Sequence, residues 1–206
     1  MTMIDRIKET YDYDEPIVLK NLDYSDLSYS AKRNALKRLV DKGDLQRYAK
    51  GVYYLPRETI FGQSILSMNE AVISKYIKDK KNIYGFFAGY KLLNELDLTT
   101  QVPNTFEVIS NRVKTDKRVT QIGKRRVILK KSIIPVTKEN EPILKLVNLI
   151  NYKQFSNLNS VEKKQIMIRI GVNENNIQLL NSMVRLLPKD TSVKIIESGV
   201  INAITS

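Results

Sequence analysis

The sequence of 206 residues contains no cysteine and no histidine. Without cysteine, disulfide bonds and thiolate–metal sites are excluded. Without histidine, Ser–His–Asp and Cys–His catalysis and histidine-ligated zinc are excluded as well. A phosphate-binding P-loop is also absent. We therefore predict that the chain holds no metal ion and no other cofactor.

Long apolar stretches are absent too. No run of about 18 apolar residues is present, so we expect no membrane span. The N-terminal stretch MTMIDRIKETYDYDE is too acidic and has too few apolar side chains for a signal peptide, so we expect a cytoplasmic location. The apolar share of 42% and the charged share of 27% are ordinary for a folded chain. The length fits a small module followed by a domain of about 150 residues.

The acidic residues do not form a pattern that is typical of an enzyme. Gly62-Gln63-Ser64 resembles the start of a nucleotidyltransferase motif, but no paired carboxylates follow that could hold a metal ion. Asp97 and Glu107 resemble part of a metal-dependent nuclease site, but no Glu-x-Lys pattern follows. We therefore predict that the chain is not an enzyme.

Positive charge is abundant and unevenly distributed. The chain has 34 basic and 22 acidic side chains, a net charge of +12, which favours polyanionic partners such as nucleic acid or an anionic membrane. Residues 1–27 carry three basic and seven acidic residues, a local net charge of −4. Residues 28–57 carry eight basic and two acidic residues, a local net charge of +6. This reversal predicts a small module with one face suited to phosphates.

The most regular pattern in this module is an amphipathic helix that begins at Ser28 or Ser30. Either hydroxyl can cap the helix, and Gly43 stands where a left-handed residue would end it. One face carries an apolar stripe at helical spacing, formed by Ala31, Ala35, Leu36, Leu39 and Val40. The other expected elements are a helix over 3–9, a strand over 17–19 or a second helix ending near Asp23, and a hairpin of strands 45–48 and 52–55.

The order of helix, helix, basic helix and hairpin is typical of a winged helix-turn-helix, which we predict for residues 1–57. In such a module the last helix presents polar side chains to base edges and the hairpin contacts the neighbouring backbone. The candidate DNA-binding residues are then Tyr29, Ser30, Lys32, Arg33, Asn34, Lys37 and Arg38 on the helix, and Arg47, Tyr48, Lys50 and Tyr53 on the hairpin. The alternative is that these basic residues only solvate an amphipathic helix. Strand alternation also sends one of Tyr53 and Tyr54 inward, so one of them is expected in the core.

The chain from residue 58 to residue 206 is predicted to be a second, mixed α/β domain with a helical C-terminal half. Its expected elements are helices over 62–78 and 90–96, a strand over 106–110, a hairpin of strands 119–122 and 127–129, and helices over 143–152, 161–170, 176–187 and 193–204. Together with the first module, this gives an α+β fold class.

A second basic segment lies over residues 112–131. It holds nine basic residues against Asp116 alone, namely Arg112, Lys114, Lys117, Arg118, Lys124, Arg125, Arg126, Lys130 and Lys131. Two interpretations stay open for this segment. It is either a second surface that contacts phosphates or RNA, or a solvated hairpin.

Several segments together resemble one known family. They are GVYYLP at 51–56 with a glycine soon after it, GFFAGYKLLNELDLTTQVP at 85–103, and FEVIS at 106–110. They are similar to the AbiEi-type antitoxins of type IV toxin–antitoxin systems, which act in abortive infection. Asp97 stands where the family is expected to have a glycine.

The resemblance implies an N-terminal winged helix that represses its own operon at inverted repeats, followed by a C-terminal antitoxin domain. The cognate toxin is implied to be a nucleotidyltransferase that is counteracted without a stable complex. The stretch over 98–103 is the most distinctive part, and Thr99, Thr100, Gln101 and Pro103 form a possible antitoxin motif within it. The alternative is a structured turn, because threonine side chains can bond to their own backbone.

Two function classes follow from the sequence. The first is an operator-binding autorepressor that is also an antitoxin, and the second is a nonspecific nucleic-acid-binding or RNA-binding accessory protein that uses residues 112–131. The two differ in specificity ratio, because only the first prefers its own promoter. Since no heptad seam or long apolar helix is present, we expect a monomer in solution that binds two half-sites of double-stranded operator DNA cooperatively.

Overall fold

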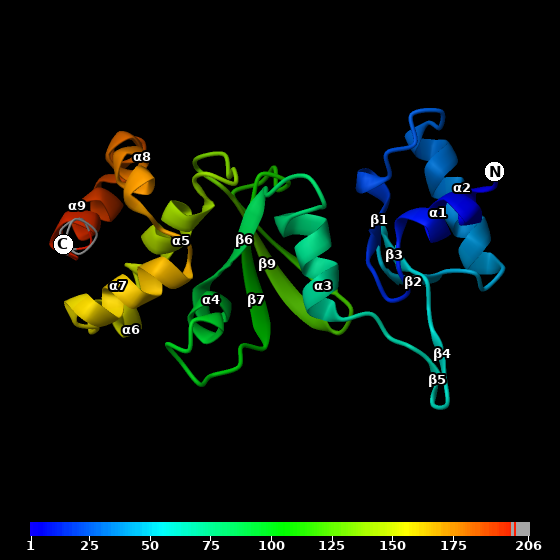
Figure 1. Ribbon diagram of the computed structural model, residues 1–206, viewed down its shortest axis with the longest axis horizontal. Coiled ribbons are helices and arrows are strands. Elements are labelled where there is room, and N and C mark those ends of the chain that lie inside the picture. Colours follow the sequence, from blue (N-terminus) through cyan, green and yellow to red (C-terminus); the bar gives the residue numbers. More distant parts are fainter. Residues whose placement is uncertain (199, 201–206) are drawn as a thin grey trace. The chain divides into compact units, whose positions relative to one another are not determined.

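The computed structural model describes residues 1–198 and 200, and its contacts divide the chain into two compact units. The N-terminal unit comprises Met1–Lys80 with Gln121–Lys124, and the C-terminal unit comprises Lys81–Thr120 and the chain from Arg125 onward. Both units contain helices and strands, which confirms the predicted α+β class (Figure 1). The division after Lys80 differs from the predicted boundary after Arg57.

The N-terminal unit is built from short helices, a three-stranded sheet and a separate hairpin. The sheet order is β1-β3-β2 and both pairings are antiparallel, with Ile17 of β1 and Arg47 of β2 on either side of Tyr53. The elements are α1 (Met3–Thr10), β1 (Ile17–Val18), the 3₁₀ turn η1 (Leu19–Asn21), α2 (Tyr29–Asp41), β2 (Gln46–Ala49), β3 (Val52–Tyr54), β4 (Glu58–Thr59), β5 (Gly62–Gln63), α3 (Met68–Val72) and the π-helical turn η2 (Ile73–Ile77).

One apolar core joins the helices to this sheet. Leu36 and Leu39 from the predicted stripe of α2 are 0% and 8% exposed, and they pack with Ile7 of α1. Burying one such side chain stabilises a fold by roughly 1.5–3 kcal/mol, so the stripe fixes which face of α2 remains in solvent. The cluster consists of Ile7, Ile17, Leu19, Leu22, Leu36, Leu39, Leu45, Tyr53 and Leu55.

Two predictions for this unit need correction. The second helix considered before Asp23 is not formed, because the chain makes the strand β1 and then only the single turn η1. The helix expected over 62–78 begins only at Met68, because Gly62 and Gln63 pair with Thr59 and Glu58 in a hairpin.

The C-terminal unit combines a mixed sheet with a group of helices. The sheet order is β6-β7-β9-β8, in which β6 and β7 are antiparallel and β7 and β9 are parallel. The elements are β6 (Gly85–Ala88), α4 (Gly89–Glu95), β7 (Thr105–Ser110), β8 (Lys117–Ile122), β9 (Arg125–Lys131), α5 (Glu141–Leu149), α6 (Lys153–Ser156), α7 (Ser160–Arg169), α8 (Glu174–Val184) and α9 (Lys189–Glu197).

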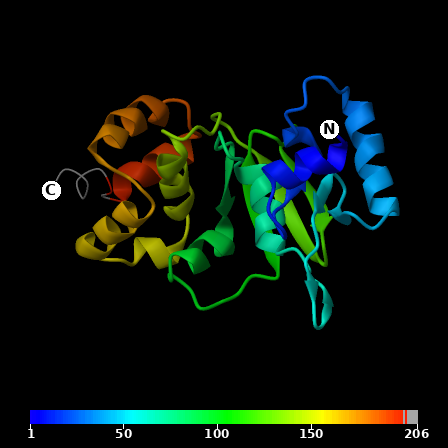
Figure 2. The ribbon, with the colours of Figure 1, turned by 45° about the vertical axis from the view of Figure 1, so that its right-hand side comes forward.

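The helical C-terminal half that the sequence predicts is present (Figure 2). Helices α5, α7, α8 and α9 pack around a core that includes Ile143, Ile166, Leu180 and Ile195. The last predicted helix, 193–204, overlaps α9, but residues 199 and 201–204 lie outside the described residues. No helix in the described part of the chain is both long and apolar enough to cross a membrane.

Candidate nucleic-acid interface

Helix α2 is the element that carries most of the candidate DNA-binding residues, and both of its ends are fixed locally. At its start, the hydroxyl of Ser28 accepts a hydrogen bond from the backbone N–H of Ala31 at 3.1 Å. At its end, Gly43 adopts a φ of +83°, and its N–H donates to the Val40 carbonyl at 3.0 Å. The N–H of Asp44 donates to the Leu39 carbonyl, which completes a Schellman cap. Of the two predicted caps, Ser28 and Ser30, the helix uses Ser28, and the predicted end at Gly43 is confirmed.

The solvent face of α2 brings together six of the seven candidate residues on this helix. Each residue turns about 100° around the helix axis, so the face opposite Leu36 and Leu39 is continuous. Its exposed members are Tyr29, Ser30, Arg33, Asn34, Lys37 and Arg38. We call this set the α2 outer face. It offers three cations, an amide, a hydroxyl and a phenol on one side of a helix.

The three cations of the α2 outer face are not neutralised by any other residue that the structure describes. In the part of the chain that the structure describes, the side chains of Arg33, Lys37 and Arg38 form no ion pair and no hydrogen bond. An exposed acid, Asp41, follows in the last turn. Exposed and unpaired cations can contact phosphates or the acceptor edge of guanine without first breaking an internal contact.

Two candidate residues are removed from the interface by the structure. The ammonium group of Lys32 donates to the Leu22 carbonyl at 2.8 Å, so this half-buried side chain ties α2 to the chain before it. Tyr53 is 6% exposed and belongs to the apolar core, so its assignment to DNA contact is wrong. Tyr54 is also 6% exposed, but it lies outside the apolar cluster that contains Tyr53, and its hydroxyl donates to the Ser64 carbonyl at 3.0 Å.

The β2–β3 hairpin supplies the rest of the predicted interface. Arg47 and Lys50 are exposed and Tyr48 is half-buried, while Gly51 makes the turn with a φ of +75°. The sequence interpretation did not include Lys42, an exposed cation at the end of α2. Its position directly before the helix-ending Gly43, within the basic stretch, was the signal that could have identified it.

The second basic segment does not act as one set of free cations. The guanidinium of Arg112 lies 3.5 Å from the centre of the Tyr84 ring, and Lys130 forms an ion pair with Glu107 at 2.6 Å. Arg125 donates to the Pro103 carbonyl at 3.3 Å. The remaining basic residues are exposed, namely Lys114, Lys117, Arg118, Lys124, Arg126 and Lys131.

Lys117 and Arg118 lie on β8, the edge strand of the four-stranded sheet. Charged side chains on an edge strand prevent pairing with strands of other molecules. The solvated-hairpin interpretation therefore accounts for these two residues without a ligand.

The possible antitoxin motif forms a loop after α4. The backbone N–H of Gln101 donates to the hydroxyl of Thr99 at 3.2 Å, a local turn of the kind expected for threonine. Thr100 and Gln101 are exposed. Gln101 and Pro103 line a cavity of about 330 Å³ together with Tyr90 and Glu107. The structured turn is thus formed, and part of it borders a cavity.

Asp97 adopts the backbone conformation that favours glycine. Its φ is +56°, its N–H donates to the Asn94 carbonyl, and the next N–H, from Leu98, donates to the Leu93 carbonyl at 2.9 Å. This is again a Schellman cap, here at the end of α4. The carboxylate of Asp97 also forms an ion pair with Arg169 at 2.7 Å. The turn therefore keeps the geometry expected for glycine although aspartate occupies it.

These features define an α+β protein of two units whose N-terminal unit exposes a basic helix. The chain belongs to the family described as "Family of unknown function (DUF6088)", whose model matches residues 7–180. Among curated proteins, no match was found. The family description names no activity, so the resemblance to AbiEi-type antitoxins stays a prediction.

Proposed function

We propose that the chain is a DNA-binding transcriptional autorepressor and the antitoxin of a type IV, AbiE-like toxin–antitoxin system. The observation that carries the DNA-binding part is the α2 outer face, which gathers Arg33, Lys37 and Arg38 without partners among the described residues. The major groove of DNA admits an α-helix. With 13 residues, α2 is about 20 Å long, enough to cross the groove.

The elements around α2 support a winged helix-turn-helix interpretation. Helix α2 leads into the antiparallel β2–β3 hairpin, and β1 adds a third strand next to β3. In this interpretation α2 is the recognition helix and the hairpin, with Arg47 and Lys50, is the wing that contacts the neighbouring backbone. In such modules another helix precedes the recognition helix. Here that position before α2 is taken by η1, which is a single turn.

The antitoxin part of the proposal rests on the resemblance alone. The loop with Thr99, Thr100, Gln101 and Pro103 is the segment that resembles the family most closely. In this proposal the C-terminal unit counteracts a nucleotidyltransferase toxin without forming a stable complex with it.

Arg33→Ala and Lys37→Ala test the DNA-binding part. If Arg33 reads a base, its loss should weaken operator binding by about 1–3 kcal/mol and relax sequence preference at one position. If Lys37 contacts a phosphate, its loss should weaken binding to all sequences alike and lower the salt slope by about 0.9. Gel shifts on promoter DNA at several salt concentrations measure both effects. Lys164→Ala, at an exposed site on α7, is the control because it removes the same charge elsewhere.

Three outcomes of this experiment are informative. Loss of affinity in the two α2 variants, with Lys164→Ala unchanged, supports the α2 outer face. Unchanged operator affinity in both α2 variants removes the assignment of α2 as the recognition helix. Equal affinity of the wild type for promoter and unrelated DNA instead favours the second candidate, a nonspecific nucleic-acid-binding protein that uses the exposed cations over 112–131.

A growth assay tests the antitoxin part. We expect that a nucleotidyltransferase encoded beside this chain's gene arrests growth when expressed alone, and that co-expression of the full chain from an unrelated promoter restores growth. The unrelated promoter removes any contribution from repression of the operon. Persistent growth arrest, with both proteins detected, would contradict the antitoxin assignment and leave the DNA-binding assignment intact.

A further inference from the structure

The β4–β5 hairpin ends in two apolar side chains that contact almost nothing. Ile60 is 93% exposed and Phe61 is 94% exposed, and Ile65 just beyond the hairpin is 82% exposed. The two strands pair Glu58 with Gln63 and Thr59 with Gly62, so Ile60 and Phe61 form the tip. The hairpin extends away from the three-stranded sheet of its own unit (Figure 1). An exposed apolar tip on a projecting arm marks an interaction site.

The tip itself has a defined conformation. The hydroxyl of Thr59 donates to the Gly62 carbonyl at 2.6 Å and accepts from the Phe61 N–H at 3.2 Å. Gly62 has a φ of +99°, which few other residues adopt. The two apolar side chains are therefore presented by an ordered turn.

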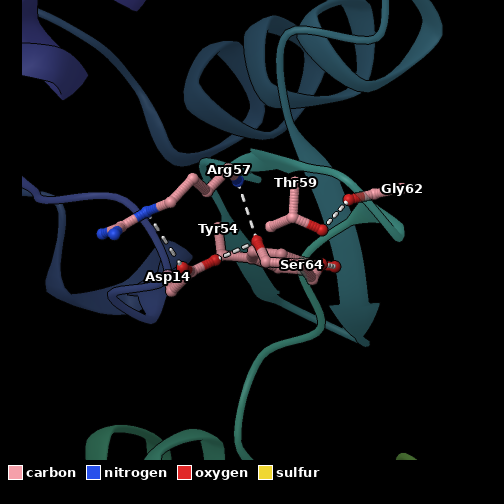
Figure 3. A network of polar contacts seen from close by, with 6 residues as sticks. All are labelled: Asp14, Tyr54, Arg57, Thr59, Gly62 and Ser64. Carbon is pink, nitrogen blue, oxygen red and sulfur yellow. Dashed lines mark hydrogen bonds and ion pairs between the residues drawn. The ribbon is translucent and has the colours of Figure 1, made fainter.

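A polar network fixes the base of the hairpin to the rest of the unit (Figure 3). The Ser64 hydroxyl donates to the carboxylate of Asp14 and accepts from the Arg57 N–H, and the Tyr54 hydroxyl donates to the Ser64 carbonyl at 3.0 Å. Arg57 also forms an ion pair with Asp14 at 3.7 Å. Burial raises the pKa of Tyr54, and the nearby Asp14 charge adds to this, so the phenol stays protonated as a donor. A hairpin whose base is already fixed loses less conformational entropy when its tip binds a partner.

The charge of this region argues against DNA as the partner of the tip. Residues 58–74 contain no lysine or arginine, although the chain has 34 basic residues, and they contain Glu58 and Glu70. A segment without cations and with two carboxylates gains nothing from the phosphate backbone, which supplies most of the affinity for DNA. The lack of cations in this segment suits contact between two copies of this chain. Each copy carries a net charge of +12, so two copies repel each other wherever cations face each other.

We propose that the hairpin tip docks against the hairpin tip of a second copy of this chain bound to the neighbouring half-site. This inference rests on the proposed operator binding and explains how two copies cooperate on it. A two-fold inverted repeat relates the copies by the symmetry that lets one surface meet itself. Ile60 and Phe61 of each copy then form one small apolar contact.

The size of this contact fits a protein that is monomeric until it binds DNA. An aromatic side chain buries about 150–250 Å², so four large apolar side chains bury on the order of 700 Å². Specific stable interfaces bury about 1,200–2,000 Å². The contact is too small to hold a dimer in dilute solution, but adjacent half-sites raise the effective concentration of the two copies to about the millimolar range.

The double variant Ile60→Ser/Phe61→Ser tests the contact. We expect its affinity for a single half-site to equal that of the wild type, and its cooperativity on the full operator to fall by about 5- to 150-fold, the usual range of coupling between two sites. Because both side chains are almost fully exposed, the change leaves the core intact. Ile168→Ser, at a 65% exposed apolar site on α7, is the matched control and should retain cooperativity. Retained cooperativity in the double variant overturns the proposal, and a loss of single half-site affinity shows instead that the tip touches DNA.

A cross-linking experiment separates failure of this contact from failure of operator binding. Because the chain has no cysteine, Phe61→Cys introduces a single thiol at the tip, and Ile168→Cys introduces one at the control site. On operator DNA, oxidation should link two copies of Phe61→Cys and should not link Ile168→Cys. If the wild type binds no half-site specifically, the proposed function fails. In that case, oxidation at high protein concentration without DNA tests the contact between tips. Equal cross-linking of Phe61→Cys and Ile168→Cys would then overturn the proposal.

Discussion

Leu36→Ala should lower the free energy of unfolding of the N-terminal unit by about 2–5 kcal/mol. Leu36 is 0% exposed and joins α2 to α1 and the three-stranded sheet, so its truncation leaves a cavity at the centre of a small core. Single domains are stable by only about 5–15 kcal/mol. A loss of this size removes a large part of the stability and should weaken operator binding at 37 °C, although Leu36 is not on the α2 outer face.

Hydrogen exchange combined with thermal unfolding measures this effect. Amide protection should fall in α1, α2 and β3 of Leu36→Ala and should stay unchanged in α5 and α7, which belong to a separate core. Ile168→Ala, at an exposed site, should change stability by less than about 0.5 kcal/mol. Wild-type protection of α2 in Leu36→Ala would mean that the apolar stripe does not hold the helix in place.

Helix α2 was predictable because its determinants are local. The cap at Ser28, the stripe that contains Leu36 and Leu39, and the left-handed Gly43 all lie within one stretch of sequence. The same reasoning gave α4, β7 and the β8–β9 hairpin. Residues that face solvent on α2 could also be predicted, because they follow from the position of the stripe.

Elements that depend on distant contacts were not predictable. The apolar spacing of Ile65, Met68 and Val72 fits a helix, but Ser64 before them is bound to Asp14, 50 residues away in the sequence, and the helix begins only at Met68. The strand β6 has no alternation to detect, because all four of its residues are buried. The boundary after Lys80 follows from these same contacts, which join residues 58–80 to the first unit.

At the candidate site, the contacts of single side chains could not be predicted from the sequence either. Helical periodicity places Lys32 beside the solvent face, but only the fold brings the Leu22 carbonyl within 2.8 Å of its ammonium group. Alternation on β3 predicts one tyrosine in the core, and Tyr53 takes that place, but Tyr54 is buried as well, with its hydroxyl bound to the Ser64 carbonyl. A single strand's pattern cannot show how many neighbours cover it.

The arrangement of two copies on the operator should depend on helical phase. One winged helix contacts few base pairs, which rarely gives enough discrimination against a genome of competing sites, and two copies on an inverted repeat multiply that discrimination. Inserting about 5 base pairs between the half-sites turns one copy to the opposite face of the DNA. We expect cooperativity to fall by about 5- to 150-fold with this insertion and to return in part with an insertion of about 10 base pairs, a full turn.

Gel shifts on the native and spaced operators, together with light scattering without DNA, test this arrangement. Each half-site should keep its own affinity in every spacing, because the contacts of the α2 outer face do not change. The double variant Ile60→Ser/Phe61→Ser should bind all three operators alike, since it lacks the contact that the spacing interrupts. A stable dimer in solution, or cooperativity that is indifferent to a half-turn insertion, contradicts two monomers that meet only on DNA. Either result would require an interface larger than the hairpin tip.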